Sequence, residues 1–279
     1  MAQVLDGKAI ANTLKAELTE RVRALQARGI TPGLAVVMVG SDEASAVYLS
    51  RKKKTGEGIG LRVDTHLLPA ESTTGQVIDL IKKLNADPAI HGILVEQPLP
   101  KGLDKDAIID SIDPQKDVDG SSLANLGNLF LGRPGFVPCT PQSVMTILER
   151  YNIPLAGKHA VVVGRSTVVG KPLSMLLLAQ NATVTICHSK TRDLPAITKQ
   201  ADILVAAVGV PKMITADMVR EGAIVLDVGI NVVDGKTVGD VDYEAVAPKA
   251  AAITPVPGGV GSVTTMIVLQ HVVESAERR

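Results

Sequence analysis

The sequence predicts an α/β protein with two α/β domains, the second of them a Rossmann-like, doubly wound parallel sheet. Short apolar runs alternate with segments of helical periodicity along most of the 279 residues. Hydrophobic residues make up 46% of the chain and aromatic residues only 2%, so the core must consist of Val, Ile, Leu and Ala. This composition suits parallel sheets that are buried on both faces, and a chain of this length has room for two cores.

The composition also argues against several classes of protein. The 29 Lys and Arg residues balance 29 Asp and Glu residues, and zero net charge argues against a nucleic-acid partner. Cys139 and Cys187 form no CxxC pair and the histidines show no ligand spacing, so neither a metal site nor a disulfide framework is expected. No segment has the pattern of a membrane span or a signal peptide, so we expect a cytoplasmic protein without a membrane partner.

The first domain is expected over residues 1–120. Its predicted strands are apolar or alternating runs at 34–39, 61–67 and 92–95. Helical spacing of apolar residues predicts the intervening helices, which cover 11–25, 44–54, 72–84 and 105–112. Residues 113–141 are rich in Gly, Pro, Asn and Asp and have little periodicity, so this segment is expected to form the crossing between the domains.

The second domain is expected over residues 140–262. Its predicted strands are apolar runs at 161–163, 182–186, 203–208, 224–228 and 251–254. Helical stretches separate the earlier runs, which is the alternation of a doubly wound sheet. A final helix, at 264–279, is expected to pack back on the first domain.

A Gly-containing loop after the first of these strands is the clearest candidate ligand site. Residues 161–172 read Val-Val-Val-Gly-Arg-Ser-Thr-Val-Val-Gly-Lys-Pro, a strand, a turn and the start of a helix. Loop N–H groups and a helix N-terminus together favour a phosphate. The spacing is not the GxGxxG of most dinucleotide folds, and an ordinary tight turn is the alternative.

The next strand indicates which dinucleotide binds. NAD sites carry an acid about 20 residues after the Gly-rich turn, where it bonds the ribose hydroxyl. Here the strand ends in Cys187-His188-Ser189-Lys190 without an acid, and Arg165 lies in the loop itself. Basic and hydroxyl groups in place of the acid fit a ribose that carries a phosphate, so the predicted cofactor is NADP.

The first domain carries a second group of candidate residues. Tyr48 and Lys52 lie four residues apart, on one face of a helix that follows a strand, where open α/β sheets bind ligands. The alternative is that Lys52 belongs to a solvated basic run, because its neighbours in Arg51–Lys54 are all basic. Asp119, in the segment Lys116-Asp117-Val118-Asp119-Gly120, has turn formation as its alternative role.

Six motifs in this order resemble one known family. They are the Ala-Ser-x-x-Tyr-x-x-x-Lys within 40–54, Pro98-Leu99-Pro100, Lys116–Gly120, Pro138-Cys139-Thr140-Pro141, Val163–Pro172 and Thr254–Gly261. Together they resemble the bifunctional methylenetetrahydrofolate dehydrogenase/methenyltetrahydrofolate cyclohydrolase family over nearly the whole chain. The resemblance implies NADP-dependent oxidation of methylene-tetrahydrofolate, then hydrolysis of the methenyl product to formyl-tetrahydrofolate, in one-carbon metabolism and purine biosynthesis. It also implies a homodimer with its site in a cleft between the domains.

The resemblance assigns roles to residues that match the family motifs. Lys52 is the implied catalytic residue, Tyr48 packs against the folate, and Asp119 holds the pterin. The implied NADP contacts are Gly164, Arg165, Ser166, Ser189 and Ile230. The implied lining of the folate channel is Pro257, Gly258 and Gly259.

One departure from the family pattern bears on the chemistry. Family members carry Val-Gln-Leu-Pro-Leu-Pro at the strand end, whereas this chain has Val-Glu-Gln-Pro-Leu-Pro, so Glu96 replaces the glutamine that partners the catalytic lysine. Gln97 is expected on the opposite side of the strand. A carboxylate beside Lys52 favours its ammonium form, and a dehydrogenase with weak or lost cyclohydrolase activity is therefore an alternative function.

Two further alternatives account for only part of the sequence. Short-chain dehydrogenases also use Tyr-x-x-x-Lys, but after the cofactor loop, whereas Tyr48 precedes Gly164 by most of a domain. A non-catalytic NADP sensor has no need of Lys52 and Asp119 together. Folate-dependent reduction of NADP distinguishes an enzyme from such a sensor.

Overall fold

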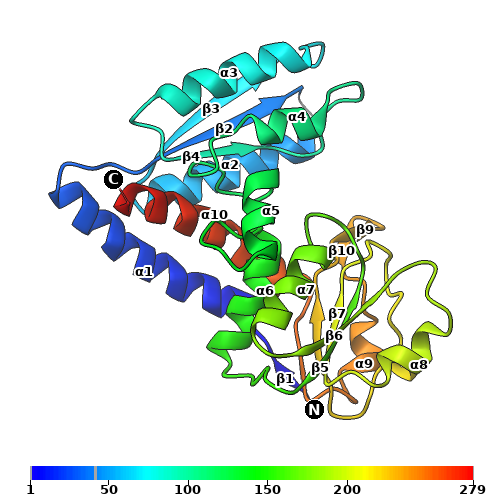
Figure 1. Cartoon of the computed structure of the whole chain (residues 1–279). Coiled ribbons are helices and arrows are strands. Elements are labelled where there is room, and N and C mark those ends of the chain that lie inside the picture. Colours follow the sequence, from blue (N-terminus) through cyan, green and yellow to red (C-terminus); the bar gives the residue numbers. More distant parts are fainter. Residues whose placement is uncertain (1, 41–42, 279) are drawn as a thin grey trace. The chain divides into compact units, whose positions relative to one another are not determined.

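The computed structural model describes residues 2–40 and 43–278, with only the backbone given for residues 43–49 and 51 (Figure 1). Contacts divide the chain into two compact units. The six-stranded unit contains Met1–Asn12 and Pro138–Thr264, and the three-stranded unit contains Thr13–Val137 and Thr265–Arg279. Within the described residues, no helix combines the length and the apolar character that a membrane crossing needs.

The three-stranded unit is built on a parallel sheet with the strand order β3-β2-β4. These strands are β2 (Gly33–Val39), β3 (Arg62–Leu68) and β4 (Gly92–Val95). β2 and β4 are buried along their whole length, which explains why they read as continuous apolar runs. The sheet lies between helices, with α3 (Thr74–Ala86) on one face and α2 (Glu43–Gly58) on the other (Figure 1).

Each face of this sheet has its own packing. On the α3 face, Val37 of β2 belongs to one buried cluster with Ile81 of α3 and Ile108 of α4 (Lys105–Asp110). On the other face α2 lies so close that a Cβ on Gly56 would be 2.9 Å from Val63 and 3.4 Å from Leu269 of α10 (Val260–Glu277). Helix α1 (Gly7–Ala27) contributes fully buried leucines and a valine.

The six-stranded unit has the strand order β1-β11-β8-β7-β5-β6, and all of its pairings are parallel. The strands are β1 (Gln3–Val4), β5 (His159–Val163), β6 (Thr183–Cys187), β7 (Ile203–Ala206), β8 (Ile224–Asp227) and β11 (Ala252–Ile253). The chain runs from β5 outwards to β6 and then returns to the other side of β5 as β7. The strand order therefore reverses between β5 and β7, and ligands bind outside the carboxyl ends of strands at such a point.

The helices and the small elements complete the two units. Those of the six-stranded unit are α6 (Cys139–Arg150), α7 (Gly170–Ala179), α8 (Leu194–Thr198), α9 (Tyr243–Val246), a 3₁₀ turn (Ala216–Met218) and an antiparallel hairpin of β9 (Asn231–Val233) with β10 (Lys236–Val238). The three-stranded unit also contains α5 (Leu123–Phe130).

The predicted α/β class and the parallel second sheet are confirmed, and three details differ. Helix α5 lies in the segment expected to be irregular, because Ser122 caps its first turn. Residues 1–12 belong to the six-stranded unit, although they were expected in the first domain, because β1 pairs with β11. Helix α10 begins at Val260, before the expected start at 264, and includes Ser262 and Val263.

Candidate active site

An ion pair joins two of the predicted site residues of the three-stranded unit. Nζ of Lys52 on α2 lies 2.7 Å from Oε1 and 2.8 Å from Oε2 of Glu96. Both side chains are shielded, with 22% of the Lys52 side chain and 12% of the Glu96 side chain exposed. The Lys52 side chain is therefore not part of a solvated basic surface. The side chain of its neighbour Lys53 is about half exposed, and its Nζ lies 3.9 Å from Oε1 of Glu57.

The backbone of the sheet places Glu96 beside Lys52. Glu96 directly follows β4, and its N–H donates to the carbonyl oxygen of Val37 on β2, at 2.9 Å. Strand alternation then directs the next side chain to the other side, and Gln97 is exposed. The carboxyl end of the sheet thus presents one acid towards α2.

A buried lysine fixes the segment that carries Asp119. Nζ of Lys116 donates to the carbonyl oxygens of Leu84, Asn85 and Asp87, at 3.1, 2.6 and 2.8 Å, and so caps the end of α3. The carbonyl of Lys116 accepts from Ile93 of β4 at 2.7 Å. This segment therefore runs alongside β4 and brings Asp119 to the strand end that carries Glu96.

The two acids of this segment have different surroundings. Asp117 accepts from the N–H groups of Gly120 and Ser122, at 3.0 and 2.8 Å, and from Nδ2 of Asn125. It therefore has the turn-forming role that was the alternative for the pair. Asp119 instead forms a side-chain hydrogen bond with Ser121.

Burial raises the pKa of Asp119 above its ordinary value, and the charge of Asp117 adds to the rise. The Ser121 hydrogen bond and the positive charge of Lys52 oppose this rise, whereas Glu96 adds to it. Lys52, Glu96 and Asp119 are thus one electrostatic group within this unit. Tyr48 lies one helical turn before Lys52 on α2, but its side chain falls outside the described part of the chain.

A tight turn in the six-stranded unit lies where the strand order reverses. Gly164 follows β5 with a φ of +130°, and a Cβ at this position would collide with the carbonyl oxygen of Ala207, which follows β7. Gly170, the first residue of α7, approaches the carbonyl of Gly164 so closely that a Cβ there would also collide. Only glycine fits at both ends of this loop.

Between the two glycines, the loop exposes the side chains of Arg165, Ser166, Thr167 and Val168. Oγ of Ser166 accepts from the N–H of Val169 at 3.1 Å, which orders the entry to α7. The Gly164 N–H donates to the Cys187 carbonyl at the end of β6, at 2.9 Å. This bond links the loop to the turn that exposes Ser189.

These features fit a phosphorylated dinucleotide. The loop offers a helix N-terminus without a side-chain cap from Val169, an exposed guanidinium and a close approach of backbone that only glycine permits. Ser189 and Lys190 stand where an NAD site carries an acid. Ile230, which follows β8 at the same edge of the sheet, is 57% exposed.

The loop at 257–259, which carries the remaining predicted site residues, packs on the start of α1. The carbonyl of Gly258 accepts from the N–H of Lys8 at 3.1 Å, and a Cβ on Gly7 would collide with the Gly259 carbonyl. Pro257 is exposed. The loop follows β11, so it also lies at the carboxyl edge of the six-stranded sheet.

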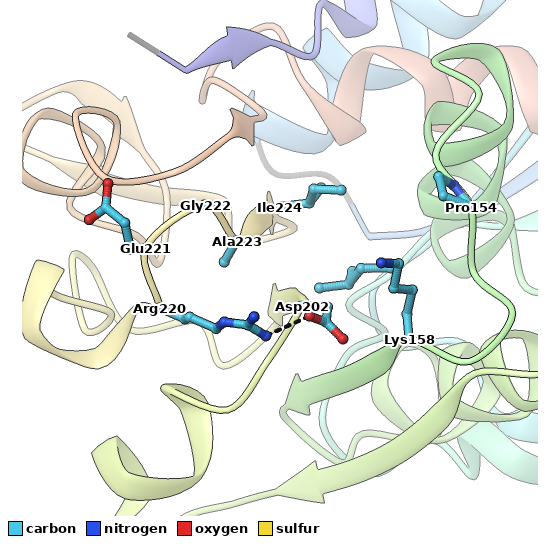
Figure 2. Close-up of a pocket in the computed structure, with 9 residues that line it drawn as sticks. Pro154, Lys158, Asp202, Arg220, Glu221, Gly222, Ala223 and Ile224 are labelled. Atoms are coloured by element: carbon cyan, nitrogen blue, oxygen red, sulfur yellow. Dashed lines mark hydrogen bonds and ion pairs between the residues drawn. The ribbon is translucent and has the colours of Figure 1, made fainter.

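A separate pocket of about 180 Å³ lies at the opposite edge of this sheet (Figure 2). Lys158, Asp202 and Ile224 line it, and they stand at the amino ends of β5, β7 and β8. Arg220 is paired with Asp202 across it, at 2.6 Å. This pocket is therefore distinct from the Gly164 loop, and its basic groups are not candidates for the cofactor phosphate.

Comparison with known proteins identifies the family. The model of the tetrahydrofolate dehydrogenase/cyclohydrolase catalytic domain matches residues 5–119, and the model of the NAD(P)-binding domain of the same proteins matches residues 138–279. The chain belongs to the tetrahydrofolate dehydrogenase/cyclohydrolase family. It is 55% identical over 278 residues to the bifunctional protein FolD of Moorella thermoacetica, with 99% of each chain covered.

Solved structures of family members have the same fold. The bifunctional FolD enzyme of Campylobacter jejuni superposes with a TM-score of 0.99 at 46% identity, and each chain is covered completely. The methylenetetrahydrofolate dehydrogenase-cyclohydrolase of Trypanosoma brucei, solved with NADP cofactor and inhibitor, gives 0.95 at 37% identity, with 99% of this chain and 98% of that chain covered.

The sequence did not show how several residues support the site. Lys116 belongs to the motif Lys116–Gly120, but its capping of a helix was not expected. Asp240 and Asp227 hold the loops after β7 and β8 through backbone N–H groups. Gly229 and Gly239, which approach these acids closely, are a local signal of this packing.

Proposed function

We propose that this chain oxidises 5,10-methylenetetrahydrofolate to 5,10-methenyltetrahydrofolate with NADP and hydrolyses the product to 10-formyltetrahydrofolate. The observation that carries the proposal is the convergence of Lys52, Glu96 and Asp119 at one sheet edge, in the domain whose family model is the catalytic one. The glycine-bounded loop at Gly164 supplies a dinucleotide site in the other unit. Relatives named for both activities cover the whole chain.

The two reactions make different demands on these residues. Loss of hydride leaves a cationic one-carbon bridge, so this step needs orientation rather than a strong acid. Hydrolysis needs a water directed at the amidinium carbon and protons moved between oxygen and nitrogen. We assign the proton transfers to the Lys52 amine, with Glu96 as its partner, and the binding of the folate ring system to Tyr48.

Asp119 suits the pterin. The amino group and the ring N–H of a pterin form a donor edge that one carboxylate can accept in a bidentate manner. Burial raises the pKa of Asp119 and so destabilises its carboxylate form. A ligand that donates two hydrogen bonds to this carboxylate would stabilise that form. Pro257, Gly258 and Gly259 are proposed to line the path of the folate.

The cofactor is proposed to bind at the Gly164 loop, where NADP would supply the hydride acceptor. Gly164 lets the backbone approach the pyrophosphate, and Arg165, Ser166 and Ser189 would hold the phosphates. Ile230 would pack against the cofactor from the loop after β8.

Assays of both half-reactions on the purified protein test this proposal. Methylene-tetrahydrofolate with NADP should give NADPH, followed by absorbance, and methenyl-tetrahydrofolate alone should be hydrolysed faster than in buffer. NADP binding without folate-dependent reduction would instead indicate a non-catalytic NADP sensor.

The Lys52–Glu96 ion pair favours a second possibility, a dehydrogenase with weak cyclohydrolase activity. Both oxygens of Glu96 accept from the Lys52 amine, at 2.7 and 2.8 Å, so this contact competes with proton transfer between the amine and the substrate. We therefore expect hydrolysis to be the slower activity.

Glu96→Gln tests this possibility. An amide can contact the amine without a negative charge and holds it less tightly, so hydrolysis should become about tenfold faster, which corresponds to about 1.4 kcal/mol of barrier. Both half-reactions are followed on the same preparation. An unchanged rate of hydrolysis would show that Glu96 does not control Lys52, and the dehydrogenase rate is the internal control.

We also propose that the protein acts as a cytoplasmic homodimer. Support comes from the family resemblance and from the two buried cysteines, Cys139 and Cys187, which are free thiols. Light scattering after size exclusion should give twice the 29.2 kDa of one chain. A mass of one chain at micromolar concentration would refute the dimer.

A further inference from the structure

Two buried carboxylates lie behind the loops at the carboxyl edge of the six-stranded sheet. Asp227 is the last residue of β8, and Asp240 follows the β9–β10 hairpin. Asp227 is 4% exposed and Asp240 is completely buried. Neither residue has a role in the proposed chemistry, and neither forms an ion pair among the described residues.

Asp240 holds the backbone directly after β7. Its Oδ2 accepts from the N–H groups of Val208 and Gly209, at 2.6 and 2.9 Å. These residues directly follow Ala207. The carbonyl oxygen of Ala207 packs so closely against Gly164 that a Cβ on Gly164 would collide with it. The other oxygen, Oδ1, accepts from Nδ2 of Asn231 at 2.9 Å, which ties β9 to the same carboxylate.

Asp227 holds the backbone after β8. Its Oδ1 accepts from the N–H groups of Gly229 and Asp240, both at 2.9 Å, and its Oδ2 accepts from Val241 at 2.9 Å. Gly229 directly precedes Ile230, the proposed cofactor contact. The Asp240 N–H thus joins the two acids into one unit, which we call the carboxylate clamp (Asp227 and Asp240).

The packing around the clamp leaves no room for a side chain at Gly229 or Gly239. A Cβ on Gly229 would collide with the Asp240 carboxylate, and a Cβ on Gly239 would collide with the Asp227 carboxylate. Charge-assisted bonds from backbone N–H groups to carboxylates are stronger than neutral ones. The clamp therefore fixes both loops more firmly than the short strands could alone.

We propose that Asp227 and Asp240 are positioning residues for the cofactor, because they hold the loops after β7 and β8 in the arrangement that NADP needs. This inference rests on the proposed binding of NADP at the Gly164 loop. Neither acid touches the cofactor in this proposal. They act through Val208, Gly209 and Ile230.

The two acids should differ in their tolerance of an amide. In Asp240→Asn the amide oxygen can still accept from Val208 and Gly209, and its NH₂ can donate to Asn231 once that side-chain amide is rotated. In Asp227→Asn one of the two carboxylate oxygens becomes an NH₂ group. That group faces either the Val241 N–H or the N–H groups of Gly229 and Asp240, and it cannot accept a hydrogen bond from them. The first variant therefore keeps most of the clamp, whereas the second breaks it.

The expected results are specific to the cofactor. Asp227→Asn should raise the KM and the Kd for NADP by about tenfold or more and change the KM for methylene-tetrahydrofolate much less, because the Asp227 carboxylate bonds Gly229, Asp240 and Val241 and not the 257–259 segment proposed to line the folate path. Asp240→Asn should raise them less. Asp242→Asn is the matched control, because the Asp242 side chain pairs with the exposed Lys212 at 3.4 Å, further along the loop after β7 than Val208 and Gly209, and is not part of the clamp; its Kd for NADP should stay within about twofold of wild type.

The wild-type protein provides a test that does not depend on a variant. Burial raises the pKa of Asp227 to about 6, three N–H groups oppose the rise, and the Asp240 charge adds to it. Lys212, Asp242, Tyr243 and Glu244 line the pocket beside it. As the pH falls through about 6, Asp227 becomes protonated and accepts the N–H groups less well, so amide exchange at Gly229 and Val241, corrected for intrinsic rates, should become faster.

Removal of the neighbouring charge should shift this transition. In Asp240→Asn the pKa of Asp227 should fall, so the midpoint for exchange should move to lower pH, whereas in Asp242→Asn it should move little.

Unchanged NADP affinity in Asp227→Asn overturns the proposal, as does an equal rise in the KM for NADP and for folate. If Asp227→Asn does not fold, an absent transition in wild-type exchange overturns it. Failure of wild type to bind NADP would refute the proposed function instead.

Discussion

Lys52→Met is expected to lower cyclohydrolase turnover by about 10²–10⁴, the range typical of a lost general acid–base group. Methionine keeps the apolar stem and removes only the amine. Dehydrogenase turnover should fall much less, because hydride transfer needs orientation more than a proton. The two activities are measured on the same preparation, and hydrolysis near the wild-type rate would show that Lys52 does not move the proton.

The ion pair changes what this substitution does to stability. From the sequence alone, loss of a lysine amine is expected to matter little for folding. In the structure Glu96 loses its partner and is only 12% exposed, so we expect Lys52→Met to destabilise the fold by about 1–3 kcal/mol. The double variant Lys52→Met/Glu96→Gln removes both charges and should recover part of that loss without recovering hydrolysis.

Lys53→Met is the matched control for Lys52→Met. Lys53 is the next residue on α2, it is about half exposed, and its contact with Glu57 is 3.9 Å long. Such exposed pairs contribute little to stability. Both activities should therefore stay near wild type, and a large loss in this variant would mean that the helix, not the Lys52 amine, is sensitive to substitution.

The sequence predicted elements well where burial alone decides structure. The strand at 92–95 has the predicted bounds, because a parallel strand buried on both faces must be continuously apolar. Gln3 and Val4 are exposed and carry no such pattern. They form a strand only because β11 offers a partner, which is a tertiary effect that local sequence does not encode.

In the candidate site too, residues set by a local pattern could be predicted, whereas those set by tertiary contacts could not. Gly164 and Arg165 could be predicted because a strand, a turn and a helix follow one another locally. The Lys52–Glu96 contact needed the family motif, since 44 residues separate the two groups. The hydrogen bonds of Asp227 and Asp240 could not be predicted, because most of their partners are backbone N–H groups, which every residue type except proline provides.

We predict that Arg165 contributes most of the preference for NADP over NAD. Arg165 follows the glycine turn with an exposed side chain, and β6 ends without the acid that an NAD site uses. A charge-assisted contact with phosphate contributes about 1.5–3 kcal/mol. Arg165→Ala should therefore raise the Kd for NADP by about ten- to a hundredfold and barely change the Kd for NAD.

Arg220→Ala controls for the loss of a positive charge from the same unit. Arg220 lies at the amino edge of the sheet, where it pairs with Asp202 at 2.6 Å (Figure 2), so it should leave the affinity for NADP unchanged. Titration calorimetry with NADP and NAD on both variants gives the comparison. Equal losses for the two cofactors in Arg165→Ala would mean that Arg165 contacts the shared part of the dinucleotide. The discrimination would then come from Ser189 and Lys190, because they occupy the position where an acid would otherwise exclude the phosphate.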